Sequence, residues 1–196
     1  FVTTKEEALA KVEELLEPGS TIASGGSMTL RECGIMELLR NGSYHYLDRE
    51  KLGLSREQIE EIYQKAFSAD AYLCSCNAVT DNGELYNVDG NSNRVAAICY
   101  GPASVIIVAG YNKIVKNIEA AVRRGKTVAA PANCRRLHCK TYCAEKGECI
   151  SLSLEQQELS GGCAGEDRVC CNYVVNAKQR KNGRIKVILV GEELGY

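Results

Sequence analysis

The chain has 196 residues, of which 45% are hydrophobic and 25% charged, and its net charge is −1. The composition is that of a soluble globular protein, and the length fits one large domain or one domain with an appendage. The balanced charge gives no electrostatic reason to expect nucleic acid or an acidic membrane as a partner, and no apolar run approaches the roughly 18 residues of a membrane span. The polar segment that follows Phe1 is unlike a signal peptide.

The N-terminal part of the chain predicts helices and strands in alternation. A capping box from Thr4 to Glu7 starts the first helix, and Pro18 and Gly19 follow its end. Ser55 is the expected N-cap of a later helix whose apolar residues recur on one stripe. We predict helices over 3–16, 27–42 and 55–67, and strands over 20–24, 43–47 and 70–76.

The alternation continues with predicted helices over 93–101 and 112–125 and predicted strands over 104–110 and 127–131. Residues 172–191 predict two strands around Asn182-Gly183, a dipeptide that suits a tight hairpin because both residues tolerate positive φ. The strands are apolar runs, so the predicted fold class is α/β, with an open and mainly parallel sheet covered by helices on both faces. Ligands of such sheets bind at the carboxyl ends of the strands.

Residues 132–171 show no periodicity, and they contain seven of the 11 cysteines. A segment of this length without periodicity is unusual inside a compact domain, so we expect something other than an apolar core to order it. We therefore divide the chain into an α/β core (1–131), a cysteine-rich metal-binding segment (132–171) and C-terminal strands (172–196) that complete the core.

Gathered thiols point to a soft metal or an iron–sulfur centre, and an odd number of cysteines excludes complete pairing as disulfides. The spacings lack the C-x2-C of typical zinc sites, whereas a [4Fe–4S] cluster tolerates more varied spacing. They therefore favour a [4Fe–4S] cluster and leave a structural zinc or metal-free thiols open. The cysteines concerned are Cys134, Cys139, Cys143, Cys149, Cys163, Cys170 and Cys171. His138 is expected to be an ordinary surface group, and cysteines elsewhere in apolar segments are expected to be buried: Cys33, Cys74, Cys76 and Cys99.

A glycine turn and a polar block are the candidates for anion binding. Gly25, Gly26 and Ser27 separate a predicted strand from a helix, where backbone N–H groups can hold a phosphate or a carboxylate. Residues 76–102 stand at the carboxyl end of another predicted strand and are rich in Asn, Asp and Gly, a composition that by itself fits a turn-rich loop better than a site. The side chains that would line a polar cleft there are Asn77, Asp81, Asn87, Asp89, Asn93 and Arg94.

Three stretches closely resemble the lactate-utilisation (LUD) domain family: "GGSMTLRECGI", "NAVTDNGELYNVDGNSNRVAAICYGPASVIIVAGYNKIV" and "GRIKVILVGEELGY". The resemblance runs from about residue 4 to residue 196. It implies an open α/β fold of the NagB/RpiA/CoA-transferase-like superfamily. It also implies a link to systems that oxidise lactate to pyruvate together with iron–sulfur and flavin-related partner proteins.

The resemblance extends to the cysteines. Short family members often end in "KTPCxxxGxCxxC" and "RICN", which "KTYCAEKGEC" and "CAGEDRVCCN" match here. The metal ligands implied are Cys143, Cys149 and Cys163, with Cys170 or Cys171 as the last member. Two departures stand out: the inserted stretch 150–162, and extra cysteines for which we expect a second metal centre or sulfur chemistry, namely Cys134, Cys139, Cys74 and Cys76.

The leading hypothesis is a cytoplasmic LUD protein whose [4Fe–4S] cluster takes part in redox metabolism of a small hydroxy or oxo acid, as an iron–sulfur oxidoreductase or its accessory subunit. Arg94 and Lys113 are the expected countercharges of the anionic metabolite. A redox partner protein and a second copy of the chain are the expected protein partners. The alternatives are an open iron used for lyase or desulfuration chemistry, and a small-molecule-binding module with a structural zinc. No persuasive Ser–His–acid set is present, so no catalytic residue is assigned.

Overall fold

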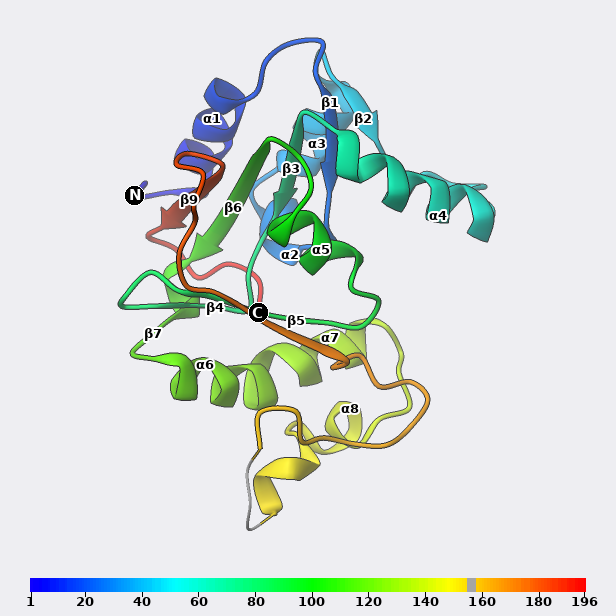
Figure 1. Cartoon of the computed structure of the whole chain (residues 1–196), viewed down its shortest axis with the longest axis vertical. Coiled ribbons are helices and arrows are strands. Elements are labelled where there is room, and N and C mark those ends of the chain that lie inside the picture. The colour runs from blue at the N-terminus through cyan, green and yellow to red at the C-terminus, as the bar shows by residue number, and fades with distance from the viewer. Residues whose placement is uncertain (155–157) are drawn as a thin grey trace. The chain divides into compact units, whose positions relative to one another are not determined.

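The computed structural model describes residues 1–154 and 158–196, and it divides into two compact units (Figure 1). Each unit is assembled from separate stretches of the chain. Unit 1 comprises Phe1–Ser75, Ala96–Asn112 and Gln179–Gly195. Unit 2 comprises Cys76–Val95, Lys113–Lys178 and Tyr196. The cysteine-rich segment 132–171 lies within unit 2, and the middle of its inserted stretch, 155–157, lies outside the described residues.

Unit 1 is built on a five-stranded sheet in which every pair of neighbouring strands is parallel. The strand order is β2 (His45–Leu47), β1 (Thr21–Ser24), β3 (Ala71–Cys74), β6 (Ser104–Gly110) and β9 (Ile185–Val190). The central strands are buried along almost their whole length, as expected for a parallel sheet with two covered faces. The predicted open parallel sheet is therefore confirmed.

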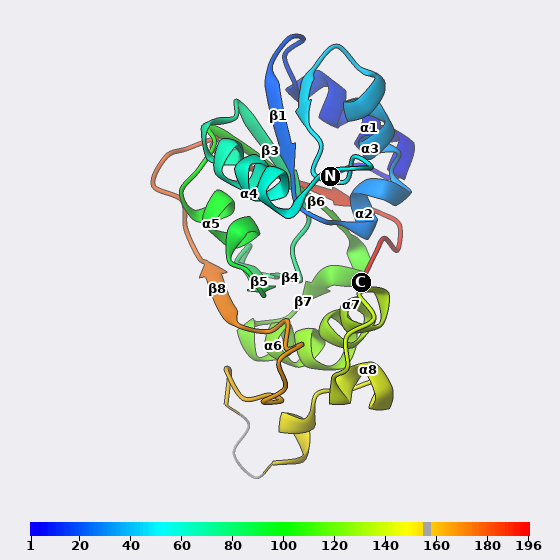
Figure 2. The same cartoon turned by 90° about the vertical axis from the view of Figure 1, so that its right-hand side faces the viewer.

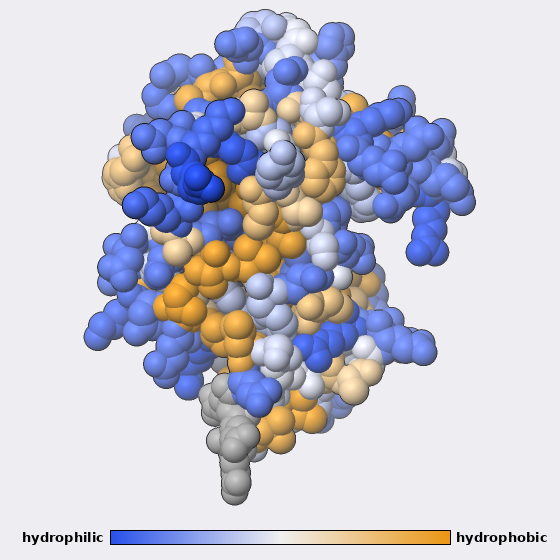
Figure 3. Space-filling model, viewed as in Figure 1, coloured by the Kyte–Doolittle hydropathy of each residue, from blue (hydrophilic) through white to orange (hydrophobic). Residues whose placement is uncertain are grey.

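Helices cover both faces of this sheet, as Figure 2 shows: α1 (Lys5–Leu15), α2 (Met28–Glu32) and α3 (Ile35–Asn41) on one side, α4 (Arg56–Lys65) and the end of α5 (Asn93–Cys99) on the other. The first three helices pack their apolar side chains against β3, β6 and β9 in one core. Helix α4 begins at the predicted N-cap, Ser55, whose side chain accepts from the Gln58 backbone N–H in a capping box. None of its residues is buried, and its outer surface is hydrophilic (Figure 3).

The single helix predicted over 27–42 is two helices in the structure. Gly34 has a φ of 71°, which places it in the left-handed region and ends α2 before α3 begins. A residue without a Cβ adopts this conformation at little cost, so the helix breaks there. The predicted stop at Gly42 is confirmed, since its N–H donates to the Leu38 carbonyl oxygen at the end of α3.

Unit 2 contains a mixed four-stranded sheet that the sequence did not predict. The strand order is β7 (Ile114–Val115), β4 (Ala78–Thr80), β5 (Leu85–Asp89) and β8 (Asn172–Asn176). Strands β4 and β5 form an antiparallel hairpin inside the polar block, around Gly83 with a φ of 83°. The two strands were not predicted because their short apolar runs are surrounded by the Asn, Asp and Gly residues of this block.

The predicted C-terminal hairpin is wrong. Gly183 has the positive φ expected of its turn, and Arg184 N–H donates to the Lys181 carbonyl oxygen at 3.3 Å. The flanking strands nevertheless do not pair: β8 runs antiparallel to β5, whereas β9 runs parallel to β6. Residues 177–184, which connect the two strands, are long enough for each strand to pair with a strand far away in the sequence.

The predicted strand over 127–131 is also wrong, and the helix predicted over 112–125 is shorter. Helix α6 (Ile118–Arg124) begins only after Asn117, whose side chain accepts from the Ala120 N–H at 2.9 Å. It continues through a π-helical turn (Gly125–Ala129) into α7 (Ala130–Arg136). Pro131 stands directly after the π-helical turn, in the first turn of α7, and it has no N–H to donate back to the preceding turn.

Short helices complete unit 2. Helix α6 packs Ala121 against Ala78 and Tyr86, which lie opposite each other on β4 and β5. The cysteine-rich segment adds α8 (Tyr142–Lys146) and a 3₁₀ turn (Ile150–Ser153). No helix in the described part of the chain combines the length and apolarity needed to cross a bilayer.

Replacing Ile106 tests the core of unit 1. Its side chain is fully buried in the middle of β6, so Ile106→Ala should lower the free energy of unfolding by about 2–5 kcal/mol in urea denaturation of the full chain. The matched control is Val187→Ala on the neighbouring strand, which is 38% exposed and should cost about 1 kcal/mol or less. Similar losses for both variants would contradict this description of the core.

Cys33 makes the stability of the chain depend on pH. Burial, with help from Glu32 and Glu192, raises the pKa of its thiol from 9.0 to about 11. Above pH 9.0 the unfolded chain therefore loses this proton before the folded chain does, and the free energy of unfolding falls until about pH 11. In Cys33→Ala this fall should be smaller, whereas Cys99→Ala, which removes an exposed thiol, should keep it. Urea unfolding across this range measures the difference, and equal slopes for all three proteins would contradict it.

Candidate metal centre

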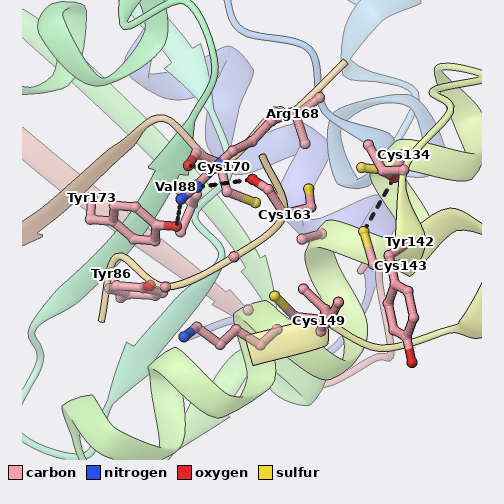
Figure 4. Close-up of a pocket in the computed structure, with 18 residues that line it drawn as sticks. Tyr86, Val88, Cys134, Tyr142, Cys143, Cys149, Cys163, Arg168, Cys170 and Tyr173 are labelled. Atoms are coloured by element: carbon pink, nitrogen blue, oxygen red, sulfur yellow. Dashed lines mark hydrogen bonds between the residues drawn. The ribbon is translucent and has the colours of Figure 1, made fainter. Parts of the chain in front are cut away.

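Five cysteines line one cavity in unit 2: Cys134, Cys143, Cys149, Cys163 and Cys170. Figure 4 shows their sulfur atoms around a common central space. The empty volume among the lining side chains, its opening to solvent included, is about 500 Å³. These thiols come from α7, α8 and the irregular segments after α8, so the fold gathers them from positions up to 36 residues apart in sequence.

Local structure places the first three thiols. Cys134 lies in α7 and Cys143 in α8, whose N-cap Thr141 accepts from the Ala144 N–H. Helix α8 ends at Gly147, which has a φ of 88° and turns the chain toward Cys149. The N–H of Cys149 then donates to the Lys126 carbonyl oxygen at 2.9 Å, which ties this cysteine to the π-helical turn.

Arg168 holds the loop that carries the other two thiols. Its Nε donates to the carbonyl oxygen of Cys170 at 2.8 Å, and its Nη1 donates to that of Cys163 at 3.0 Å. Its Nη2 donates to the Ser160 carbonyl oxygen at 2.6 Å and to the Tyr173 hydroxyl at 3.1 Å. One guanidinium therefore supplies the hydrogen bonds that a loop without secondary structure lacks.

The thiol of Cys170 lies close to three others in the cavity. Burial raises the pKa of Cys170 to about 12, and the neighbouring thiols of Cys143, Cys149 and Cys163 raise it as well. All four of these cysteines line the same cavity. Burial also raises the pKa of the Cys134 thiol to about 12, and the side chains of Thr141, Cys143 and Cys139 affect it.

Two cations line the same cavity, Arg168 and the buried Lys126. The Lys126 Nζ donates to the Glu158 carbonyl oxygen at 2.6 Å, on the loop that Arg168 also holds. Among the described residues, no carboxylate lines the cavity. Sequence reasoning missed both cations, because nothing in "GKTVA" or "GEDRVCC" distinguishes them from surface charges.

The other cysteines and His138 lie outside this cavity. Cys171 is exposed and its Sγ donates to the Arg168 carbonyl oxygen at 3.3 Å, so the structure brings Cys170 and not Cys171 into the group. Cys139 is half-buried, and His138 is exposed with a φ of 56°. Cys74 ends β3 in unit 1, Cys76 begins unit 2, and both are buried along with Cys33, whereas Cys99 is exposed.

In the described ranges, no three His, Cys, Asp or Glu side chains converge closely enough to ligate a single metal ion. The thiols surround a space instead of meeting at a point (Figure 4). The donor set itself, neutral thiols that ionise on binding a soft metal, fits an iron–sulfur cluster.

The glycine turn lies in unit 1, apart in sequence from these thiols. Ser27 is the N-cap of α2, and its side chain accepts from the Leu30 N–H at 3.2 Å. The N–H of Gly25 donates to the Leu73 carbonyl oxygen. A Cβ at Gly26 would stand 2.5 Å from Arg49 Nη2, the far end of a flexible side chain that would have to shift to make room.

The polar block forms a network centred on Arg94 in unit 2. Its Nη1 donates to Asn87 Oδ1 at 2.5 Å, and its Nη2 donates to Asn77 Oδ1 and to the Val88 carbonyl oxygen. Asp89 accepts backbone N–H bonds at the start of α5 and lies 3.7 Å from Arg94 Nε.

The other candidate residues are Asp81, Asn93 and Lys113. Asp81 is exposed at the β4–β5 turn, and Asn93 is half-buried at the start of α5. Lys113 is buried; burial raises the pKa of the Cys76 thiol, and Lys113 and Arg94 both oppose that rise, so the two cations lie near the same thiol. The structure therefore brings together Asn77, Asn87, Asp89 and Arg94 as a network that shapes the chain, as the turn-rich interpretation of this block predicts.

Solved structures similar to this chain have low identity to it. The chain is 17% identical to eIF2B delta from Chaetomium thermophilum, with a TM-score of 0.39, covering 58% of this chain and 49% of that one. Ribose 5-phosphate isomerase A from Neisseria gonorrhoeae is 14% identical to the chain, with a TM-score of 0.38, and the match covers 60% of this chain and 57% of that one. The chain thus spans about half the length of these two proteins. A DUF162 family protein from Deinococcus radiodurans is covered over 98% of its length by 95% of this chain, with 14% identity and a TM-score of 0.32.

No protein with a curated function matches the sequence significantly. The model of the LUD domain, by contrast, matches residues 1–190, nearly the whole chain. The resemblance carried by the three sequence stretches is therefore confirmed, and the chain belongs to the LUD domain family.

Proposed function

We propose that the cavity in unit 2 holds a [4Fe–4S] cluster ligated by Cys143, Cys149, Cys163 and Cys170. The observation that carries the proposal is the convergence of these thiols, from separate turns and loops, on one space (Figure 4). When bound, such a cluster supplies one-electron redox chemistry at a potential set by its surroundings. A structural zinc, which four thiolates can also ligate, is the alternative.

The residues around the thiols suit this role. Apolar and aromatic side chains close the cavity beside the sulfurs: Tyr86, Val88, Ile150, Val169 and Tyr173. A wall of this kind excludes water from a centre that water and oxygen would degrade, and it lowers the local dielectric constant. Arg168 orients two of the ligands through their own carbonyl oxygens, so the loop is shaped before a metal binds.

Membership of the LUD family connects this chain with lactate utilisation. We infer a part in the redox metabolism of a small hydroxy or oxo acid, with the cluster passing electrons to or from a partner protein. No disulfide joins any of the 11 cysteines, all of which lie in the described part of the chain, and this fits a reducing compartment such as the cytoplasm. Arg94 and Lys113 remain the proposed contacts for the acid. Reversible reduction by dithionite supports electron transfer, whereas a spectral change on adding lactate or pyruvate without a change of oxidation state indicates an open iron instead.

The adjacent pair Cys170 and Cys171 gives a matched test of the ligand set. Anaerobically reconstituted wild-type chain should be brown and contain about four irons and four sulfides. Cys170→Ser should lose most of this iron, because a ligand facing the cavity is removed. Cys171→Ser should retain it, because that thiol is exposed outside the cavity. Iron and acid-labile sulfide analysis measures both variants.

Two outcomes contradict this assignment. If the protein is colourless and contains one equivalent of zinc after anaerobic purification and reconstitution, the cavity holds a structural zinc and not a cluster. Full iron content in Cys170→Ser together with loss in Cys171→Ser would show that the ligand is the other member of the pair. Cys143→Ala provides an independent check, and it should lose iron as Cys170→Ser does.

A further inference from the structure

The cavity contains one thiol more than a four-ligand centre needs, and it contains two positive charges. The hydrogen bonds of Lys126 and Arg168 end on backbone carbonyl oxygens and on one tyrosine hydroxyl, all of them uncharged. In the described part of the chain, neither residue forms an ion pair and no carboxylate lines the cavity. Removing cations from water without a countercharge is costly, so an anion is expected beside them.

The charge of a thiolate metal centre depends on the number of its thiolates. Four thiolates around the doubly positive core of an oxidised [4Fe–4S] cluster form a dianion, and three form a monoanion. A fifth ionised thiol would make a trianion. Lys126 and Arg168 together balance a dianion, so the charges of the cavity select four thiolates from the five cysteines.

The family's cysteine pattern identifies the cysteine that remains. Cys143, Cys149, Cys163 and Cys170 match that pattern and line the cavity, whereas Cys134 is an additional cysteine on α7 that lines the same cavity. The Thr141 Oγ1 lies 3.4 Å from the Cys143 Sγ, so a hydroxyl and a thiol adjoin the same ligand. Hydrogen bonds to a ligand sulfur are among the features that tune a cluster's potential.

We propose that Lys126 and Arg168 are the paired countercharges of a dianionic four-thiolate centre, and that Cys134 is a positioning residue beside Cys143 and not a ligand. The proposal rests on the proposed cluster. It deepens that function by fixing the charge and the ligand number of the centre. Reduction adds a negative charge, so the two cations favour the reduced state and raise the reduction potential.

Charge-removing and charge-keeping variants test the role of the cations in the reconstituted full chain. Lys126→Met and Arg168→Gln should each lower the equilibrium constant for reduction by about tenfold, which is about 59 mV for a one-electron couple. Lys126→Arg and Arg168→Lys keep the charge and should stay near the wild-type potential. Arg168→Lys should still lose iron to a chelator faster, because a lysine cannot reproduce the four hydrogen bonds of the guanidinium. Lys140→Met removes an exposed cation of the same unit and should leave the potential unchanged.

Cys134→Ala and Cys134→Ser test the ligand number. Both should keep four irons and the electron paramagnetic resonance signal of the reduced wild-type cluster. Loss of iron in both variants, with retention in Cys143→Ala, would overturn the ligand set and the charge argument with it. Unchanged potentials in both Lys126→Met and Arg168→Gln would overturn the countercharge role while leaving the cluster itself intact. Wild-type chain that takes up no cluster would instead refute the proposed function.

Discussion

Hydrogen bonds from two cations to backbone carbonyl oxygens hold the cysteine-rich part of unit 2 together. Polar backbone groups in a loop must find partners, and the segment around Cys163 has neither a sheet nor a long helix to provide them. Arg168 bonds carbonyl oxygens on both sides of itself in sequence, and Lys126 bonds the carbonyl oxygen of Glu158. The thiols can line a cavity because these bonds, and not an apolar core, determine the path of the loop.

The sequence predicted the parts of the fold whose residues meet apolar neighbours on all sides. Strands such as β6 are continuous apolar runs, and burial on both faces leaves little else that they could form. Prediction from the sequence failed where a strand pairs with a partner that is distant in the sequence. Nothing near β8 and β9 shows that each pairs with a different sheet, since the Asn182-Gly183 turn between them favours a local hairpin. Residues 127–131 likewise suit a strand by composition, but they continue directly from α6 as helix.

The candidate site divides in a similar way. Cysteine is rare enough that its spacing pointed to a common centre, and the structure places five of the seven cysteines of the segment around one cavity. Cys139, half-buried, and Cys171, exposed, lie outside it. The choice between Cys170 and Cys171 needed the structure, because the direction of a side chain at the edge of β8 is not encoded in spacing. The roles of Lys126 and Arg168 were not predicted, because they depend on which carbonyl oxygens these side chains bond, and the sequence does not show this.

The inserted stretch 150–162 is the main departure from the family's cysteine pattern, and the structure explains how Cys163 still reaches the cavity. Glycines bring the end of the insertion close to its surroundings. A Cβ at Gly161 would stand 3.3 Å from the Ser151 Cβ, and one at Gly162 would stand 3.3 Å from the Arg168 guanidinium. The chain can therefore pass directly against Arg168, whose Nη1 then bonds the Cys163 carbonyl oxygen. An insertion of this kind lengthens the loop without changing where it ends, because the hydrogen bonds to Arg168 fix its last residues independently of its length.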